Sequence, residues 1–348
     1  MEPVRVGIIG CGNIYQMHAH PLSHMQGTQL AAVCDILPQR AEAAAGRYGC
    51  AAYTDYKDMI ENAGLQAVHI CLPHYLHPPV AIYAMEQGLD VVTEKPMGIA
   101  YADALRMRET SLAAGRRLGV IFQNRYNPGT RLVKEALDSG RLGKIYGMRC
   151  EVAWHRDQAY YDSAGWRGRW DTEGGGVIIN QAIHTLDLMR WFAGREIESI
   201  AASIAHRGPT SIEVEDTAEG LITFAGGLQG LFYLTVNYSR DARTLLELDC
   251  EKGTARLDAA RGCIRFADGQ VEEADEDGSD AQQYGGGKDY WGFSHYRQIR
   301  DFYEDPTGET ADRSCQEALL TQAMICGIYE AARKGQTVRL SRPAAAAR

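Results

Sequence analysis

The sequence contains no C-x-x-C pair, no H-E-x-x-H segment and no stripe of basic residues. Its nine cysteines are scattered singly, and a chain of 348 residues needs no disulfides to hold its core. We therefore expect reduced thiols and no metal site, although His18, His20 and His24 lie close together. The net charge of −9 argues against a nucleic-acid partner, because phosphate backbones attract clustered Lys and Arg.

Long hydrophobic runs are also missing. The apolar stretch from Val4 to Ile9 is too short for a membrane span or the core of a signal peptide, and it leads directly into a glycine loop. We expect a soluble, cytoplasmic protein with no membrane partner. With 45% hydrophobic and 23% charged residues the chain has the composition of a globular protein, and its length predicts two domains.

The first third of the chain alternates short apolar runs with amphipathic segments, which is typical of β-α-β units around a parallel sheet. The apolar content of the runs is nearly continuous, as in strands that are covered on both faces. We expect strands at Val4–Ile9, Leu30–Cys34, Ala67–Leu72, Asp90–Thr93 and Leu118–Phe122. A helix is expected to begin at His77-Pro78-Pro79 and to end at Gly88.

After Asn127-Pro128 the pattern changes. It predicts helices at 131–137, 177–192, 293–303 and 316–334, a strand at 146–154 and a mostly antiparallel sheet over 200–266. The acidic and glycine-rich stretch 272–288 predicts a mobile loop, and residues 343–348 predict a frayed tail. The fold class is therefore an α/β domain at 1–123 with a parallel sheet, followed by an α+β domain at 124–348 with a large, mostly antiparallel open sheet.

A glycine loop follows the first expected strand and precedes an amphipathic segment. In Gly10-Cys11-Gly12-Asn13-Ile14, the two glycines let the backbone turn tightly and approach a pyrophosphate at a helix N-terminus. Tyr15 occupies the place of a third glycine, where helix-strand packing is decided, so we expect a shifted helix and an intact phosphate site.

The cofactor is indicated by the end of the second expected strand. Asp35 stands where a carboxylate hydrogen-bonds the adenosine ribose and repels a 2′-phosphate, which favours NAD over NADP. Arg40 lies close enough to cover the adenine or to attract a phosphate. We predict NAD.

From these residues onward the chain resembles the Gfo/Idh/MocA family of glucose-fructose oxidoreductases, inositol 2-dehydrogenases and rhizopine-catabolism proteins. The matching residues are Gly10, Gly12, His18, Asp35, Pro73, His77, Glu94-Lys95-Pro96 and the segment from Gly174-Gly175-Gly176 through Asn180 and His184 to Asp187. The resemblance implies a Rossmann domain followed by an α+β domain whose open sheet often forms the subunit interface. Because such exposed sheets commonly pair, we expect a homo-oligomer, a dimer or a tetramer.

Two of the matching segments are interpreted as halves of one catalytic site. Lys95 follows the strand Asp90–Thr93 at a carboxyl-terminal edge, where open parallel sheets bind ligands. Asn180 and His184 are spaced i and i+4, which predicts one helical face. We expect both halves to meet over the nicotinamide.

Oxidation of a secondary alcohol needs a base for the hydroxyl proton and a donor for the charge that develops on oxygen. Lys95 and His184 suit these roles, and either assignment is open. Many relatives carry Asp at the position of Asn180. We hypothesise that the neutral amide removes a negative charge that would hold Lys95 protonated, so that Lys95 acts as the base.

Further residues are expected to contact the cofactor or the substrate. Contacts to the cofactor are expected from Leu72, Pro73, His74, His77, Glu94, Asn124 and Arg167, besides Gly10, Gly12, Asn13, Ile14, Asp35, Arg40 and Lys95. Contacts to the substrate are expected from Lys95, Arg125, Tyr126, His155, Tyr161, Asn180, His184 and His295, with the region near Tyr290 at the pocket rim. The resemblance also implies a cis Lys95–Pro96 bond, and Asp187 is expected either to support His184 or to pack its helix.

Three functions are consistent with the sequence. The first is an NAD(H)-dependent oxidoreductase that transfers hydride to or from a secondary alcohol carbon of a sugar, inositol or glycoside, including C3 of a glucoside. The second is an NAD-recycling glycosidase that works by oxidation and elimination. The third is a non-catalytic regulator that binds NAD and a sugar. The retention of Lys95 and His184 favours an enzyme.

Overall fold

The computed structural model describes residues 2–276 and 294–340. By packing, the described chain divides into two compact units. Residues 2–123 and 294–319 form the first, and residues 124–276 and 320–340 form the second. Our sequence-based boundary between residues 123 and 124 assigned 294–319 to the later domain. These residues lie with the first unit because their apolar faces, including Ile299, Phe302 and Ala311, belong to its core.

The first unit is built on a six-stranded parallel sheet with the order β3-β2-β1-β4-β5-β6. The strands are β1 (Val4–Ile9), β2 (Thr28–Cys34), β3 (Ala51–Tyr53), β4 (Ala67–Ile70), β5 (Asp90–Thr93) and β6 (Leu118–Val120). Reversal of strand order between β1 and β4 creates the crevice at which such sheets bind nucleotides. All of β4 and the last four residues of β1 are buried, as the continuous apolar runs predicted.

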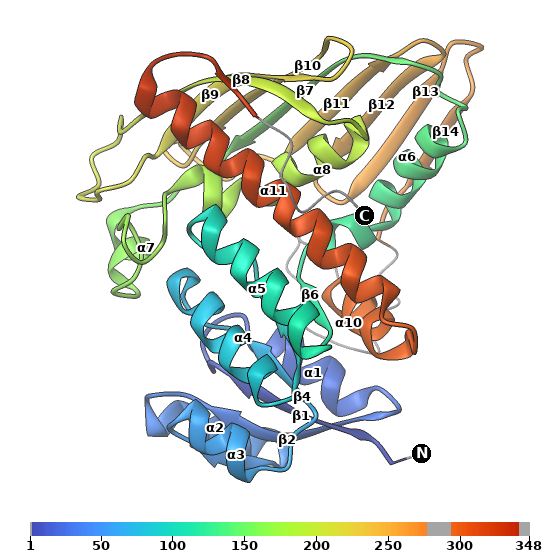
Figure 1. Ribbon diagram of the computed structural model, residues 1–348. Helices are drawn as coiled ribbons and strands as arrows, with labels where there is room; N and C mark the ends of the chain where they lie inside the picture. The colour runs from blue at the N-terminus through green and yellow to red at the C-terminus, as the bar shows by residue number, and fades with distance from the viewer. Residues whose placement is uncertain (1, 277–293, 341–348) are drawn as a thin grey trace. The chain divides into compact units, whose positions relative to one another are not determined.

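Helices cover this sheet (Figure 1). They are α1 (Gln16–His24), α2 (Pro38–Tyr48), α3 (Tyr56–Asn62), the 3-10 turn η1 (His74–Leu76), α4 (His77–Glu86), α5 (Tyr101–Ala114), α10 (Ser294–Glu304) and the first part of α11 (Glu309–Lys334), up to Leu319. Pro78 and Pro79 lie in the first turn of α4, as expected. Tyr15 precedes α1, and its ring lies edge-on to Tyr48 at 6.4 Å between centroids.

The second unit contains a nine-stranded sheet with the order β14-β13-β12-β11-β7-β10-β9-β8-β15. Its strands are β7 (Ile145–Ala153), β8 (Ile197–Ala205), β9 (Thr217–Phe224), β10 (Leu228–Thr235), β11 (Leu245–Cys250), β12 (Gly253–Asp258), β13 (Arg261–Phe266), β14 (Val271–Ala274) and β15 (Val338–Arg339). All pairs are antiparallel except β7 with β10. The sheet is therefore mostly antiparallel, as predicted.

One face of this sheet is covered and the other is open. Helices α6 (Pro128–Asp138) and α8 (Ile183–Ala193) pack on the covered face (Figure 1). Buried and exposed residues alternate along β10, which is the pattern of a strand with one solvated face. The unit also holds the turn η2 (Gln123–Tyr126), from Asn124 onward, the short helix α7 (Gln158–Asp162) and the π-turn η3 (Val177–Gln181).

Some elements differ from those predicted. The expected helix over 177–192 is divided into η3 and α8, because the backbone first turns through a wider π-helical step. Glu272 to Ala274 pair as β14 with β13, although their acidic composition predicted a loop. Residues 277–288 of that predicted loop, Tyr290 and the predicted tail lie outside the described residues.

Two further observations concern the chain as a whole. All nine cysteines are free thiols. Within residues 2–276 and 294–340, no helix combines the length and the apolarity that crossing a bilayer would require.

Candidate active site

The glycine loop after β1 leaves room for a phosphate. Gly10 has φ +98°, and a Cβ added there would lie 2.5 Å from the carbonyl oxygen of Cys71, so only glycine fits. A Cβ added at Gly12 would meet nothing within 4 Å, which leaves open space beside the backbone. Asn13 is exposed, and Ile14 is half-buried against the core. This geometry fits a pyrophosphate held against backbone N–H groups.

Asp35 follows β2 at the same edge of the sheet. Its buried carboxylate accepts hydrogen bonds from the backbone N–H groups of Cys11 and Leu37, each at 2.9 Å. These bonds hold the carboxylate beside the glycine loop, and each of its oxygens retains capacity for a ribose hydroxyl. Arg40 is exposed at the start of α2.

The sequence reasoning missed an apolar surface beside Asp35. Ile36 is 85% exposed and Leu37 is 44% exposed, at the carboxyl end of a buried strand. Two large apolar side chains in water are costly unless a flat ligand covers them. Their position directly after Asp35, the carboxylate that we predict to bind the ribose, fits an adenine ring. Their adjacency to Asp35 in the sequence was the signal that could have identified them.

Lys95 follows β5 at the carboxyl edge of this sheet and is half-buried. The Lys95–Pro96 bond is cis, as the resemblance implied. His77 is fully buried, and its Nδ1 and Nε2 lie 2.7 Å from the carbonyl oxygen of Pro96 and 2.8 Å from that of Leu72. The ring therefore joins the segment after β4 to the segment that carries Lys95. His74, also buried, lies beside it at 6.0 Å between ring centroids.

Glu94, next to Lys95, is the centre of a buried hydrogen-bond network. Its Oε1 accepts from His18 Nε2 at 2.9 Å and from His295 Nε2 at 3.1 Å, and its Oε2 accepts from the backbone N–H of Lys95 at 3.3 Å. His18 Nδ1 lies 2.8 Å from His69 Nδ1, whose ring reaches the hydroxyl of Tyr303 at 2.9 Å. His295, predicted to contact substrate, is thus buried against Glu94.

One set of tautomers satisfies every bond in this network with neutral imidazoles. Tyr303 donates to His69, His69 to His18, and His18 to Glu94. Burial alone raises the pKa of Glu94, but hydrogen bonds from His18 and His295 hold that pKa well below its ordinary value. Burial lowers the pKa of His18 and His69. The network therefore holds one negative charge beside the backbone of Lys95.

His18, Glu94 and His295 also satisfy the spacing of a metal site. One ligand atom from each lies within 4.8 Å of the others. Each of these atoms takes part in a hydrogen bond inside the group, so the network is complete without an ion. His20 and His24 face each other separately on α1, with ring centroids 4.2 Å apart.

In the second unit, η3 places Asn180 and α8 begins just before His184. The Asn180 Nδ2 group donates to Glu173 Oε1 at 2.5 Å and to the hydroxyl of Tyr160 at 3.3 Å. The start of η3 is fixed by Glu215, which accepts from the N–H groups of Gly176 and Ile178 at 2.9 and 3.1 Å. His184 is buried, with 8% of its surface exposed.

Several polar groups gather around the Tyr160 hydroxyl. Arg167 and Gln181 donate to it, in addition to Asn180. Arg167 also stacks on the Tyr160 ring, and its Nε is buried without a hydrogen-bond partner among the described residues. The buried amide oxygens of Asn124 and Gln181 and the hydroxyl of Tyr161 likewise have no such partner in the described chain. Buried polar atoms of this kind are normally satisfied by a ligand or water.

Other predicted substrate residues have structural partners. Arg125 forms a two-pronged ion pair with Asp187, with both N···O distances at 2.7 Å. Thr321 Oγ1 donates to the same carboxylate at 2.5 Å, so Asp187 secures the packing of α8. Tyr126 lies under the guanidinium of Arg131 at 4.7 Å. His155 is exposed at the end of β7, where its Nδ1 lies 2.8 Å from the carbonyl oxygen of Tyr238.

Two protein-family models match this chain. A model described as an oxidoreductase family with an NAD-binding Rossmann fold matches residues 4–122, and the GFO/IDH/MocA C-terminal domain matches residues 130–256. An inositol 2-dehydrogenase of Rubrobacter xylanophilus is 30% identical over 76% of this chain and 74% of its own length. The chain belongs to the Gfo/Idh/MocA family.

Solved structures of other Gfo/Idh/MocA proteins share the whole fold. The WlbA dehydrogenase from Bordetella pertussis, in complex with NADH and UDP-GlcNAcA, is 30% identical, has a TM-score of 0.83 and is matched over 98% of this chain and 100% of its own. Levoglucosan dehydrogenase, solved with NADH and L-sorbose, has a TM-score of 0.86 at 21% identity. The match covers 99% of this chain and 100% of that protein, and at this identity it shows a shared fold alone. This Gfo/Idh/MocA chain is an NAD(H)-dependent oxidoreductase.

Proposed function

We propose that this chain transfers hydride between NAD and a secondary alcohol carbon of a sugar, inositol or glycoside. The observation that supports it most directly lies within the first unit. Lys95 occupies the carboxyl edge of the sheet that also carries the open glycine loop and Asp35. A protonatable side chain is thereby held at the edge where nucleotides bind.

The residues of the first unit hold the cofactor in this proposal. Gly10 and Gly12 accommodate the pyrophosphate, Asp35 binds the ribose, and Ile36 with Leu37 covers the adenine. When bound, NAD supplies the hydride acceptor or donor. His77 and Glu94 keep the segment around Lys95 fixed, because both make buried hydrogen bonds to it.

The substrate is handled by Lys95, Asn180 and His184. Loss of hydride from a C–H bond requires removal of the hydroxyl proton and stabilisation of the charge on oxygen. One of Lys95 and His184 accepts that proton and the other donates a hydrogen bond to the same oxygen. The amide of Asn180, fixed by Glu173 and Tyr160, orients the hydroxyl.

Arg167 favours a substrate with an acidic group. No carboxylate among the described residues pairs with its guanidinium, which contacts Tyr160 and Trp166 instead. A half-buried cation without a counter-ion favours an anion. The WlbA relative was solved with an acidic nucleotide sugar and the Rubrobacter relative is named for inositol, so the test panel spans both chemistries.

The test compares wild type with Lys95→Ala on myo-inositol, glucose, glucuronate, UDP-linked uronic acids and aryl glucosides, with NADH absorbance as the readout. We expect turnover of at least one compound, and a fall in kcat of roughly a hundredfold or more in Lys95→Ala with NADH binding retained. Lys144→Ala, an exposed lysine, is the control.

Other results would contradict the proposal. Equal kcat in wild type and Lys95→Ala would remove Lys95 from the chemistry. Release of an aglycone without net NADH would identify the glycosidase, and NAD binding without turnover on any compound would identify the regulator.

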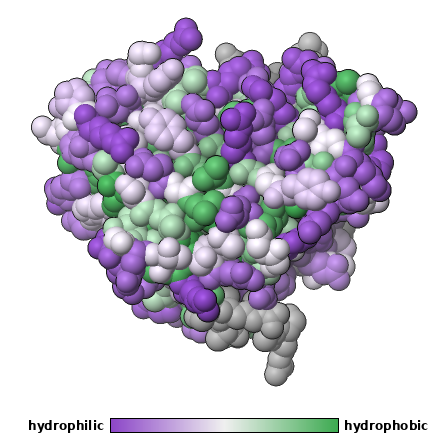
Figure 2. Space-filling view, turned by 90° about the horizontal axis from the view of Figure 1, so that it is seen from above, coloured by the Kyte–Doolittle hydropathy of each residue, from purple (hydrophilic) through white to green (hydrophobic). Residues whose placement is uncertain are grey.

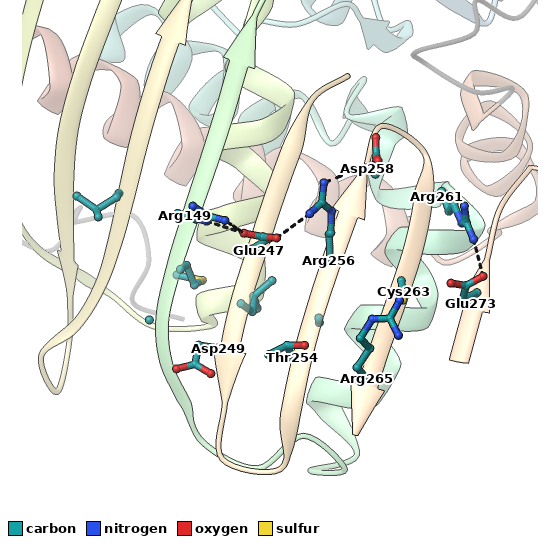
Figure 3. A pocket seen from close by; sticks show the side chains of 15 residues that line it. Arg149, Glu247, Asp249, Thr254, Arg256, Asp258, Arg261, Cys263, Arg265 and Glu273 are labelled. Carbon is teal, nitrogen blue, oxygen red and sulfur yellow. Dashed lines mark hydrogen bonds and ion pairs between the residues drawn. The ribbon is translucent and has the colours of Figure 1, made fainter. Parts of the chain in front are cut away.

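We also propose a cytoplasmic homo-oligomer that associates through the open face of the nine-stranded sheet. Figure 2, which views the molecule from above, shows hydrophobic residues (green) gathered among hydrophilic ones (purple). Leu231 and Tyr233 on β10 are 57% and 42% exposed. A shallow pocket on this sheet is lined by charged pairs such as Arg149–Glu247 and Arg261–Glu273 (Figure 3). Apolar side chains with alternating charges can complement a second copy of themselves.

A further inference from the structure

A buried carboxylate is the hydrogen-bond partner of the Asn180 amide. Glu173, seven residues earlier, is 1% exposed, and its Oε1 lies 2.5 Å from Asn180 Nδ2. Because carboxylate oxygens can only accept, the amide must turn its NH₂ group toward Glu173. The amide oxygen then faces the opposite side. The neutral side chain at position 180 is therefore oriented by a buried carboxylate directly behind it.

We propose that Glu173 is a positioning residue that fixes the Asn180 amide and keeps one negative charge at this side of the site. This inference rests on the proposed function of Asn180. It changes the expectation drawn from the sequence, which assumed that an asparagine leaves the site without that charge.

Glu173 is itself held rigidly. Its Oε2 accepts from the backbone N–H of Gly168 at 2.5 Å, so its two oxygens bridge the loop before η3 and the side chain of Asn180. Gly168 has φ +73°, and a Cβ there would lie 2.8 Å from Ile212, so the loop at that point has little freedom. A buried carboxylate with a fixed backbone partner can orient an amide without itself touching substrate.

Glu173 acts electrostatically on three neighbouring tyrosines. Its charge raises the pKa of Tyr160, Tyr161 and Tyr329, after the larger effect of their burial. Arg167 and Arg156 act on Tyr160 in the opposite direction, while Glu215 and Asp216 act on Tyr161 in the same direction as Glu173. The electrostatic influence of Glu173 thus reaches the cluster that contains Arg167 and Asn180.

The test exchanges the carboxylate of Glu173 and the amide of Asn180 between the two positions. Four proteins are compared: wild type, Glu173→Gln, Asn180→Asp, and the double variant, in which an amide at 173 faces a carboxylate at 180. The double variant preserves both the hydrogen bond and the net charge, with donor and acceptor reversed. Asp171→Asn is the matched control, because Asp171 is an exposed carboxylate two residues away that pairs with Arg169.

The activity arm measures kcat, KM and the pH profile of kcat/KM with the best substrate of the panel. We expect Glu173→Gln to lose roughly tenfold or more in kcat and to move the limb of the profile that reports the acid-base groups to lower pH, because a nearby negative charge stabilises their protonated forms. The double variant should recover to within about threefold of wild type. A double variant as impaired as Glu173→Gln, or an unmoved limb, would leave Glu173 with a purely structural role.

The stability arm is independent of turnover and of any substrate. In Asn180→Asp alone, two carboxylates face each other, which raises the pKa of the pair. Its melting temperature should therefore fall below that of wild type at pH 8 and return toward it at pH 5. This pH dependence should vanish in the double variant. Its persistence there, or its absence from Asn180→Asp, overturns the proposal even if the proposed function holds; an expected stability result without turnover on the panel refutes the proposed function instead.

Discussion

At the scale of single residues, Glu215 is deeply buried and its carboxylate accepts hydrogen bonds from three donors. It accepts from Gly176, from Ile178 and from the hydroxyl of Tyr329 at 2.9 Å. Burial raises the pKa of Glu215 to about 7, against the opposing effect of these hydrogen bonds. The same carboxylate fixes the start of η3, so its protonation state bears on the turn that carries Asn180.

Glu215→Gln should change how stability depends on pH. A carboxyl group whose pKa is raised on folding stabilises the protein fully below its unfolded value, near 4.5, and that contribution is lost as pH rises to about 7. The shift corresponds to about 3 kcal/mol. We expect the free energy of unfolding of wild type to fall by up to about this amount between pH 4.5 and 7, relative to Glu215→Gln.

Urea denaturation of both proteins at several pH values measures this difference. The glutamine variant loses one acceptor for Gly176 N–H, which costs a constant amount at every pH. A difference between the two proteins that stays constant from pH 4.5 to 7 would contradict the raised pKa.

The places of two candidate site residues were predictable from single residues, because residue type and position after a strand define them. Asp35 and Lys95 both follow parallel strands at the carboxyl edge of the sheet, as expected. The partners of His18 and Asn180 were not predictable, since a sequence does not show that His295 lies beside Glu94 or that Glu173 faces Asn180. Such pairs depend on packing between distant segments.

At the scale of elements, His77 joins the ends of two neighbouring strands. It begins α4, and its ring nitrogens hold the carbonyl oxygens of Leu72, after β4, and Pro96, after β5. Burial lowers the pKa of His77, while the two carbonyl groups raise it. Both strands end at the edge where the cofactor is proposed to bind.

The substitution His77→Ala should make the segments that follow β4 and β5 less rigid. We expect a loss of roughly 2–4 kcal/mol in the free energy of unfolding, because a buried ring is removed and a buried carbonyl group loses its N–H donor. We also expect the Kd for NADH, measured by fluorescence, to rise about tenfold. His24→Ala is the control, since His24 is exposed and its ring contacts the carbonyl oxygen and the ring of His20 in its own helix. Equal effects from both variants would contradict the joining role.

Strands and helices were predicted well where the spacing of apolar residues distinguishes one from the other. The five strands expected in the first third of the chain were all found, and a sixth, the three-residue β3, was too short to show a pattern. The division between η3 and α8 was missed, because Val177 to Ala193 is buried almost throughout and a wider helical step leaves no mark on such a pattern.

At the scale of the whole molecule, the open sheet predicts association. Light scattering of wild type should give a multiple of 38.4 kDa. The pair Leu231→Asp and Tyr233→Asp should shift the protein toward the monomer, because two charges would have to be buried at the interface. Leu112→Asp, which alters an equally exposed leucine on α5, should not. A monomeric wild type would refute this proposal.

The packing of residues 294–319 into the first unit has a consequence for biosynthesis. Within that unit His295 binds Glu94, Gln298 binds the backbone at Phe122 and Val120, and Ser314 binds that of Val120. A nascent chain that has emerged from the ribosome only as far as residue 123 holds every strand of the nucleotide-binding sheet but lacks these partners. The unit that is begun first is therefore not completed until residues 124–276 of the second unit have been synthesised.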